Sequence, residues 1–487
     1  MSKKIRRFVH LDLKGAPPKP SFLETFFPLL TTLGVEGLLV EWEDSFPYTG
    51  DIQDIGSLGS SSASGGHYIP KEASEIMKLA KVHSLMTIPL IQTFGHMEFV
   101  LKHSKFKHLR EYNISPSCIC PSQEDSLNLI KEMIDQMLAF HTDSEYIHIG
   151  ADEVWHLGQC EKCTAKMEIL KYKQHSLWLD HVVAVAQYVR IRYPNTKVML
   201  WDDMFRNIDE AILKEYNIGE LVEPMVWYYH TLDDFFSPNL WNKYCNVFPH
   251  LWGATAFKGA TGSRQIMPVP YHHIQNHECW IRGLALYNDQ IKNFHGLVLT
   301  GWSRYDHYAT LCELLPSGIP SLCNCLLTLE NGKYSPEIIQ SEMTSLGFIL
   351  PNIHMDDTTI VPQFPGSQLY INMDWLNHFI RKYKIEIDSE RFNTWFNHWQ
   401  RNTKYTTPYH VNSMKSTINS LFISRLLSEI EKLEDFITSS IHDIYYEHTV
   451  EELYGTLIHP IKENLYKLNQ YCLLQNEECP TKPKPID

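Results

Sequence analysis

The sequence predicts an α/β fold, in which a (β/α)8 barrel of the TIM type is followed by a mostly helical C-terminal region. Short apolar runs alternate with longer amphipathic ones through about the first three hundred residues, which is the pattern of repeated βα units. The short runs are almost continuously apolar, as expected for parallel strands that are covered on both faces. After about Ser321 the alternation fades, and longer helical patterns follow.

Eight strand-like runs are present, which is the number that closes a barrel of this type. They span Phe8–Leu13, Gly37–Glu41, Met86–Ile91, Tyr146–Gly150, Lys197–Trp201, Leu221–Trp227, Val247–Trp252 and Gly296–Gly301. Between the third and fourth runs, apolar residues recur at helical spacing from Leu127 to Leu138. Ser122 and Asp125 are placed to form a capping box at the start of this helix.

Several segments fall outside the βα pattern. Gly50–Gly66 is rich in glycine and serine and is predicted to be a loop, either a surface insertion or a lid over the site. Leu346–Pro365 is a predicted connection, and amphipathic helices are expected at Ile423–Leu433 and Leu453–Leu474. The predicted division of the chain is a barrel at 1–345, a helical region at 346–476 and a disordered tail at 477–487.

Composition excludes several classes of partner. The 487-residue chain has a net charge of −14, which argues against nucleic acid because phosphates demand a basic face. No apolar run is long enough to cross a membrane, and charged residues interrupt the apolar start, so neither an anchor nor an export signal is expected. Eleven cysteines in a chain of this length predict reduced thiols in the cytosol.

One cysteine spacing resembles a metal or redox motif, Cys160-x-x-Cys163. Because no second pair accompanies it, we predict no metal site there. The sequence also has no glycine-rich phosphate loop with a lysine, and we predict that the protein uses no cofactor.

The most informative stretch runs from Tyr146 to Val154. A short apolar strand ends at a glycine and an alanine, and Asp152 and Glu153 follow with nothing between them. Two carboxylates held side by side resist ionising together, so one can stay protonated and the pair can divide acid and base roles. Taken alone, an Asp-Glu pair can equally begin a loop or cap the next helix.

Other polar and aromatic side chains follow the remaining strands, at the face of the barrel where the chemistry of such folds lies. They are Lys14, Glu41-Trp42-Glu43-Asp44, Gln92 and His96, Trp201-Asp202-Asp203, Trp227-Tyr228-Tyr229, Lys258 and Trp302. A tryptophan ring suits the apolar face of a pyranose, while acids bind its hydroxyl groups. The recurrence of acids and tryptophans at these ends therefore indicates a sugar site.

The segment His148–Glu153 resembles the His-x-Gly-(Gly/Ala)-Asp-Glu signature of the family 20 glycoside hydrolases, the β-N-acetylhexosaminidases. Further matching blocks are His10–Pro18, Gln92–Glu98, Trp201–Met204, Phe257–Gly262 and Thr300–Tyr308. Together they are most similar to the nucleocytoplasmic branch of that family. The resemblance runs from about Phe8 to about Ser321, roughly two thirds of the chain.

This resemblance implies substrate-assisted catalysis, in which the 2-acetamido oxygen of the sugar attacks its own anomeric carbon. Asp152 would then orient the acetamide and stabilise the oxazolinium, and Glu153 would protonate the leaving oxygen and later deprotonate water. His96 would support the general acid, linked to either Glu43 or Asp44.

The resemblance also implies the residues that hold the sugar. Tyr229 would bond to the acetamide carbonyl, inside a box of Trp201, Trp227 and Trp302. Asp202 is a further candidate for substrate contact. Secreted and lysosomal members carry an arginine after the first strand and an extra N-terminal domain. Here Lys14 takes the place of that arginine, and the first strand begins within ten residues of Met1.

The sequence therefore predicts an exo-acting, retaining β-N-acetylhexosaminidase that removes terminal GalNAc or GlcNAc, with galactosaminides tolerated or preferred. The resemblance implies a cytoplasmic and nuclear location and allows a homodimer. Two alternatives remain open at this point. One is a glycan-binding barrel without turnover, which the intact acid pair argues against, and the other is a scaffold whose C-terminal helices contact a partner.

Overall fold

A computed structural model describes residues 5–56, 68–348, 363–417, 420–473 and 479–483. The chain forms two compact units. The first comprises Met1–Pro365 together with Ile444–Glu447, and the second comprises Gly366–Asp443 and His448–Asp487. The predicted division at residue 345 remains a prediction, and most of the predicted connection, 349–362, lies outside the described residues. So do 57–66 of the predicted loop and 477–478 and 484–487 of the predicted tail.

The first unit is a closed barrel of eight parallel strands, and the predicted fold class is confirmed. Each strand pairs with the next barrel strand along the chain. The strands are β1 (Arg6–Asp12), β2 (Gly37–Glu41), β3 (Met86–Leu90), β6 (Tyr146–His148), β7 (Lys197–Trp201), β8 (Glu223–Trp227), β9 (His250–Lys258) and β10 (Asn293–Gly301). A separate antiparallel hairpin, β4 (Arg110–Tyr112) and β5 (Ser115–Ile119), lies between β3 and β6 in the chain.

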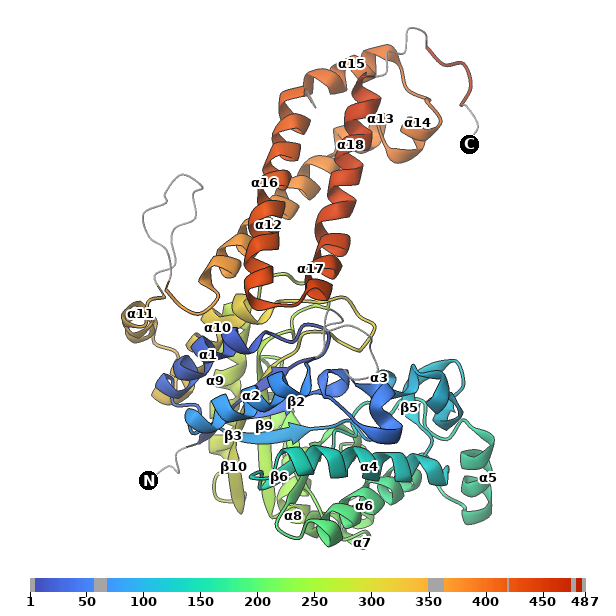
Figure 1. Cartoon of the computed structure of the whole chain (residues 1–487), viewed down its shortest axis with the longest axis vertical. Coiled ribbons are helices and arrows are strands. Elements are labelled where there is room, and N and C mark those ends of the chain that lie inside the picture. Colours follow the sequence, from blue (N-terminus) through green and yellow to red (C-terminus); the bar gives the residue numbers. More distant parts are fainter. Residues whose placement is uncertain (1–4, 57–67, 349–362, 418–419, 474–478, 484–487) are drawn as a thin grey trace. The chain divides into compact units, whose positions relative to one another are not determined.

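Helices surround the strands and begin where the sequence favours a helix start (Figure 1). They are α1 (Pro20–Thr32), α2 (Pro70–Val82), α3 (Glu98–Leu101), α4 (Glu124–Phe140), α5 (Glu161–Leu170), α6 (Gln174–Arg192), α7 (Glu210–Glu215), α8 (Pro238–Val247), α9 (Pro270–Tyr287), α10 (Leu315–Asn331) and α11 (Pro336–Ser345). Several begin with a proline, whose fixed φ suits the first helical turn and whose missing N–H is not needed there.

Strand register brings the site residues to one level. Asp12 pairs with Glu41, Glu41 with Leu90, and Leu90 with His148, so the residues that follow these strands emerge side by side. Below them the barrel is filled by large apolar side chains, among them Phe8, Ile88 and Trp252. The packed interior gives the loops above it a rigid base.

Two local predictions are wrong. The seventh strand is not Val247–Trp252, because Val247 ends α8 and β9 runs from His250 to Lys258. A Cβ atom at Gly253 would lie 2.6 Å from the Leu297 side chain, so the strand needs a small residue at this tightly packed position. Small residues do not form a recognisable apolar run in the sequence.

The predicted capping box of α4 is also wrong. Gln123 is the N-cap residue and makes no side-chain capping bond. The Ser122 hydroxyl instead lies 3.0 Å from the sulfur of Cys163. The hydroxyl that the sequence pattern assigned to helix capping therefore contacts a residue distant in the sequence.

The second unit is helical, which confirms the predicted character of the C-terminal region. Its helices are α12 (Ser367–Ile387), α13 (Glu390–Trp395), α14 (His398–Asn402), α15 (Pro408–Thr417), α16 (Ser420–Ile444), α17 (Glu447–Leu453), a π-helical turn η8 (Tyr454–Ile458) and α18 (His459–Leu473). The long helices α12, α16 and α18 lie side by side (Figure 1), and the Asn372 amide donates to Phe436 O and Ser440 Oγ, both at 3.0 Å.

The short segment Ile444–Glu447 belongs to the barrel unit by its contacts. Tyr445 forms a bridge with Pro18, and its hydroxyl accepts the N–H of Leu315 at the start of α10. Ile444 O accepts the N–H of Lys19 at 2.6 Å. Across the described ranges, no helix combines the length and apolarity that a membrane crossing requires.

Candidate active site

The strand ends of the barrel surround a cavity of about 310 Å³. This volume is at the lower end of the range for small-molecule sites, so it suits one sugar ring better than a chain of them. Eight of the eleven predicted site residues line it: Lys14, His96, Asp152, Glu153, Trp201, Trp227, Tyr229 and Trp302. The other three, Glu43, Asp44 and Asp202, are not among the lining residues.

The loop after β6 reaches the cavity through an unusual backbone. Gly150, Ala151 and Glu153 all have positive φ angles, of 62°, 66° and 47°. Such angles cost free energy for residues other than glycine and occur where surrounding contacts over-determine the chain, often at functional sites. Here Trp178 donates its indole N–H to Ala151 O, and the N–H of Glu153 donates to Asp203 Oδ2 at 3.0 Å.

Asp152 is a buried carboxyl group, with 8% of its surface exposed. Burial raises the pKa of Asp152 to about 6, helped by the charges of Glu153 and Glu41 and opposed by that of His96. Its Oδ1 atom is buried and has no hydrogen-bond partner within the described part of the chain. The cavity therefore contains an acceptor ready for a donor from outside the protein.

His96 sits between the two acids. Its Nε2 atom lies 3.2 Å from Glu153 Oε2 and 3.5 Å from Asp152 Oδ2, and its own φ is 51°. Burial on its own lowers the pKa of His96, but the charge of Asp152 and the hydrogen bond to Glu153 outweigh this and raise it to about 10. A protonated imidazole thus lies within reach of both acidic side chains.

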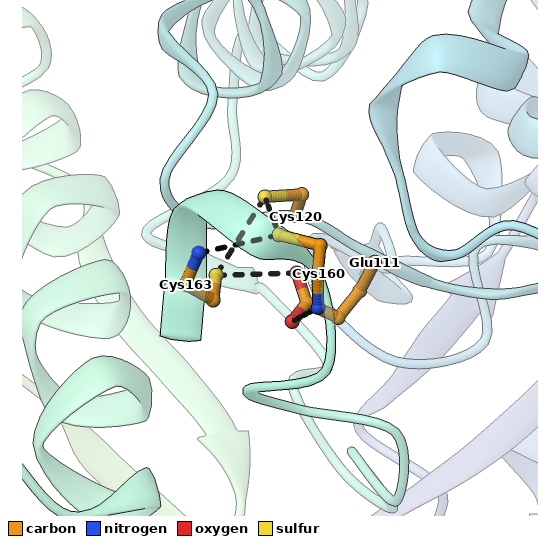
Figure 2. A group of neighbouring side chains, drawn as sticks. All are labelled: Glu111, Cys120, Cys160 and Cys163. Carbon is orange, nitrogen blue, oxygen red and sulfur yellow. Dashed lines mark hydrogen bonds between the residues drawn. The ribbon is translucent and has the colours of Figure 1, made fainter. Parts of the chain in front are cut away.

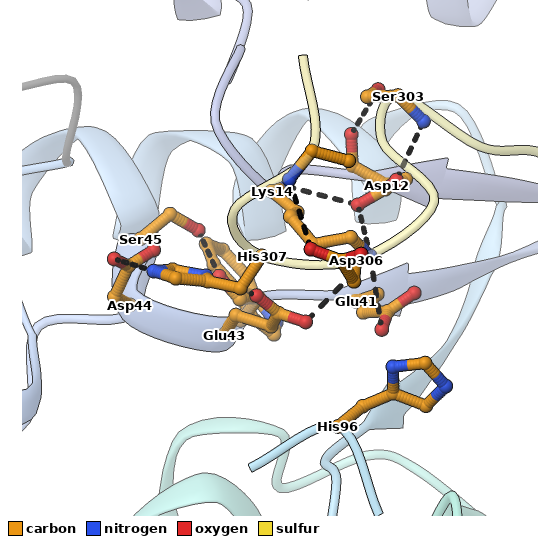
Figure 3. A network of polar contacts seen from close by, with 12 residues as sticks. Asp12, Lys14, Glu41, Glu43, Asp44, Ser45, His96, Ser303, Asp306 and His307 are labelled. Atoms are coloured by element: carbon orange, nitrogen blue, oxygen red, sulfur yellow. Dashed lines mark hydrogen bonds and ion pairs between the residues drawn. The ribbon is translucent and has the colours of Figure 1, made fainter. Parts of the chain in front are cut away.

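Glu43 and Asp44 face a different histidine. His307 Nδ1 lies 3.0 Å from Glu43 Oε2, and its Nε2 lies 3.5 Å from Asp44 Oδ2 (Figure 3). Lys102 Nζ also contacts Asp44, at 2.6 Å. The acid that lines the cavity after β2 is Glu41, whose carboxylate lies 2.9 Å from His10 and interacts electrostatically with His96.

Lys14 is buried above the end of β1 and among acids. Its Nζ lies 3.3 Å from Asp12, 3.5 Å from Glu41 and 3.6 Å from Glu43 (Figure 3). Burial lowers the pKa of Lys14, but the three carboxylates outweigh it and raise the pKa well above the usual range. Lys14 therefore presents a fixed positive charge to the cavity, 5.3 Å from the centre of the Trp302 ring.

Aromatic side chains form another part of the cavity wall. The ring centres of Trp201 and Trp302 are 5.8 Å apart, and Trp227 stacks on Tyr229 with centres 5.3 Å apart. Lys258 donates to Trp302 O at 2.6 Å and so fixes that loop from behind. Burial raises the pKa of Tyr229, which keeps its hydroxyl protonated as a hydrogen-bond donor.

The two aspartates after β7 lie in different surroundings. Asp202 is fully buried behind the cavity wall, where it accepts both guanidinium N–H groups of Arg206 and the backbone N–H of Trp227. Asp203 accepts the N–H of Glu153, and burial together with the charge of Asp152 raises the pKa of Asp203 to about 7. Asp202 thus holds Arg206 and the backbone of Trp227, whereas Asp203 holds the acid loop and also accepts the Trp227 indole N–H at 3.4 Å.

Sequence reasoning did not select several residues that line the cavity. Glu41 ends β2 and Gln92 follows β3, so the sequence placed both at strand ends, although neither was chosen as a site residue. Arg304 and Tyr305 come from the loop after β10, and a glycine at position 15 leaves the space in which the Arg304 side chain lies. Only the fold shows that close approach.

Three groups of described side chains have donor atoms close enough for one metal ion. Glu43, Asp44 and His307 form one, but Lys102 already contacts Asp44 and His307 there. A second, Glu223, His250 and His295, lies at the opposite ends of the strands, away from the cavity. The third comprises Glu111, Cys120, Cys160 and Cys163, which come from the β4–β5 hairpin region and the start of α5.

Comparison with known proteins identifies a family. Residues 40–229 match the model of the glycosyl hydrolase family 20 catalytic domain. Human hexosaminidase D is 38% identical over 475 residues, which covers 95% of this chain and 93% of the human protein. Bovine hexosaminidase D is 43% identical, with 68% of this chain and 94% of the bovine protein covered.

Solved structures match the fold at much lower identity. The chitobiase of Flavobacterium johnsoniae superposes with a TM-score of 0.53 at 13% identity, covering 96% of this chain and 70% of that one. A β-N-acetylhexosaminidase from Bacteroides fragilis gives a TM-score of 0.50 at 15% identity, with 70% of each chain covered. At such identities the likeness shows the fold alone.

Proposed function

Because this chain belongs to glycosyl hydrolase family 20, we propose that Asp152 and Glu153 divide the work of its active site between them. The protein is a glycoside hydrolase of the β-N-acetylhexosaminidase type, exo-acting and retaining, and its substrate supplies the nucleophile. The observation that carries the assignment is the neighbouring acid pair in a cavity of about 310 Å³ with an aromatic wall.

In the first step the acetamido oxygen of the sugar attacks the anomeric carbon while the glycosidic C–O bond breaks. Glu153 donates its proton to the leaving oxygen. Asp152 accepts the acetamide N–H and balances the positive charge of the oxazolinium that forms. The buried Oδ1 of Asp152, which has no partner within the described residues, supports this role.

In the second step Glu153 takes a proton from water, whose oxygen attacks the anomeric carbon and reopens the oxazolinium. Two displacements at one carbon retain the β configuration. His96 contacts Glu153 throughout, and we assign it to holding that carboxyl group in place. Glu41, rather than Glu43 or Asp44, is our choice for the acid that supports His96.

We assign the remaining cavity residues to sugar recognition. Tyr229 donates to the acetamide carbonyl, and Trp201, Trp227 and Trp302 enclose the methyl group and the ring. Lys14 and Arg304 supply the positive charge for the hydroxyl groups on the far side of the ring. A lysine binds as a compact point charge and not as a planar fork, so we propose that both GalNAc and GlcNAc are accepted.

The test compares the aryl β-glycosides of N-acetylglucosamine and N-acetylgalactosamine across pH. We expect hydrolysis of both, and competitive inhibition by a thiazoline that mimics the oxazolinium. Failure of the thiazoline to bind tightly would contradict substrate assistance, and binding of either glycoside without turnover would contradict the enzyme assignment.

We also propose that the protein works in the cytoplasm and nucleus, as a homodimer, without binding nucleic acid or membrane. The ten described cysteines are free thiols, which suits a reducing compartment. A net charge of −14 disfavours phosphate backbones. Cell fractionation and light scattering of the purified protein test the location and the oligomeric state separately.

A further inference from the structure

We propose that Glu111, Cys120, Cys160 and Cys163 form a structural zinc site, which joins the loop carrying His96 to the loop carrying the acid pair. Sequence analysis predicted no metal because Cys160-x-x-Cys163 has no second pair. The fold supplies the two other ligands from the region of the β4–β5 hairpin. The donor atoms of all four side chains lie within 4.8 Å of one another.

Figure 2 shows the four side chains converging on one point. The sulfur of Cys120 lies 3.3 Å from that of Cys160 and 3.6 Å from that of Cys163. Glu111 Oε2 lies 3.2 Å from the sulfur of Cys163. These four atoms come from three separate parts of the chain, namely β4, the end of β5 and the start of α5.

The sulfur separations suit a tetrahedral metal better than a covalent bond. Zn–S bonds of about 2.3 Å place neighbouring sulfurs of a tetrahedron about 3.8 Å apart. A disulfide requires about 2.05 Å. The observed distances of 3.3 and 3.6 Å are close to the first value and far from the second.

Backbone N–H groups orient two of the proposed ligands, Glu111 and Cys160. Glu111 Oε1 accepts the N–H groups of Gln159 and Cys160, at 2.7 and 3.1 Å, which turns the other oxygen toward the sulfurs. The Cys160 sulfur accepts the N–H of Cys163 at 3.3 Å. Outer contacts of this kind orient the ligands of a metal and tune their affinity.

Burial makes a counter-charge favourable at this place. Glu111, Cys120 and Cys163 are all buried, and a buried carboxylate beside sulfur atoms is stabilised by a cation. Three thiolates select a soft or borderline ion, and Zn²⁺ takes both sulfur and carboxylate ligands. Binding would release the thiol protons to solvent, and four protein ligands leave no open position for a substrate.

The position of the cluster gives the ion a structural role. Cys120 directly follows β5, whose Ser117 O accepts the N–H of Met97 and whose Ile119 N–H donates to Phe94 O, on either side of His96. Cys160 ends the loop that begins with the acid pair and is the N-cap of α5. The ion would therefore join the two loops whose side chains meet in the cavity.

The experiment measures metal in the purified full-length protein, independently of hydrolysis. We expect about one zinc per chain by elemental analysis. Replacement of zinc by Co²⁺ should give the sulfur-to-metal charge transfer and intense visible bands of tetrahedral thiolate cobalt. Cys160→Ser should lose the metal, while Cys118→Ser, which replaces a buried cysteine of β5 outside the cluster, should keep it.

A second variant covers the case in which Cys160→Ser does not fold. Glu111→Gln keeps an oxygen for the N–H groups of Gln159 and Cys160 but removes the carboxylate ligand, so Zn²⁺ affinity should fall at least roughly tenfold. The proposal is overturned if wild type binds neither Zn²⁺ nor Co²⁺, if the cobalt spectrum lacks thiolate bands, or if the chemically reduced protein re-forms a Cys120–Cys160 disulfide in the presence of zinc. None of these outcomes bears on whether the enzyme hydrolyses a hexosaminide.

Discussion

Two pairs of neighbouring acids end adjacent strands of the barrel, Asp152-Glu153 after β6 and Asp202-Asp203 after β7. In sequence they look alike. In the structure both members of the first pair line the cavity, and Asp152 Oδ1 has no partner among the described residues. The oxygens of Asp202 instead accept hydrogen bonds from Arg206, Tyr244 and the N–H of Trp227.

An acid pair is available for chemistry when at least one of its buried oxygens has no partner among the described residues, as is the case for Asp152 Oδ1. A carboxylate that accepts several internal hydrogen bonds is a structural element, since its charge and lone pairs are already used. Asp203 is intermediate, because it lies beside the acid loop and bonds to the Glu153 N–H. Substitutions of these four acids, and of His96 beside the first pair, test whether the two pairs differ in this way.

The largest effect is expected for Glu153→Gln. Loss of the transferable proton should lower kcat by roughly 10²–10⁴-fold for substrates with poor leaving groups. Activated aryl glycosides should lose less, because their leaving oxygen needs less protonation. Thermal unfolding should stay close to wild type, and unchanged rates on an alkyl glycoside would refute the assignment.

Asp152→Asn should follow, with kcat lowered roughly 10²–10³-fold as the charge that balances the oxazolinium disappears. In wild type, burial raises the pKa of Asp152 to about 6, and the ionised form is the one that works. Activity should therefore increase as pH rises through about 6 and decrease below it. A kcat/KM profile measured from pH 4 to 8 checks this, and an acidic limb retained in Asp152→Asn would assign it to another group.

Asp202→Asn should affect stability more than chemistry. Removing the carboxylate leaves the Arg206 guanidinium without its bidentate partner, which should cost about 3 kcal/mol of folding free energy. The activity per folded molecule should change less than in either Asp152 or Glu153 variants. Urea unfolding followed by tryptophan fluorescence measures the loss.

Asp203→Asn is the matched control at the neighbouring position. It should unfold at nearly the wild-type urea concentration, because the amide oxygen of the new side chain can still accept the Glu153 N–H, and the other hydrogen bond of Asp203, from the Trp227 indole, is a long one of 3.4 Å. If Asp203→Asn proved less stable than Asp202→Asn, our distinction between the two residues would fail.

His96→Gln should mainly change the pH dependence of activity. The positive charge of His96 lowers the pKa of Asp152, so its removal should move the acidic limb of kcat/KM upward. For an opposite charge at 3.5 Å the shift should be roughly 1 pH unit or more. A limb that moves to lower pH would contradict the electrostatic role of His96.

The sequence was enough to predict the barrel and the surroundings of the acid pair. Continuous apolar runs mark covered parallel strands, and residues after such strands necessarily share one face. That argument placed Lys14, His96 and the aromatic residues near the cavity that they line. It could not separate Asp202 from Asp203, because only the fold shows that Arg206 and Tyr244 reach the first of them.

Long-range partners account for most of what the sequence did not predict. The cluster with Cys160 and Cys163 includes Cys120 and Glu111, about 40 and 50 residues earlier, and spacing rules see only near neighbours. β9 was misplaced because its central residues are small and owe their place to the bulk of Leu297 and Trp280. In both cases the position of a residue depends on a side chain far away in the sequence, and a pattern read along the chain does not connect the two.

The Ile444–Glu447 segment has a consequence for how the enzyme is made. Tyr445 accepts the N–H of Leu315, which it follows by 130 positions in the chain. When the ribosome has synthesised all eight strands of the barrel, it has therefore not yet synthesised Ile444–Glu447. We expect the nascent barrel to remain incomplete until nearly the whole polypeptide has emerged. A chain that ended before Ile444 would lack the Tyr445 hydroxyl that accepts the Leu315 N–H in the first turn of α10.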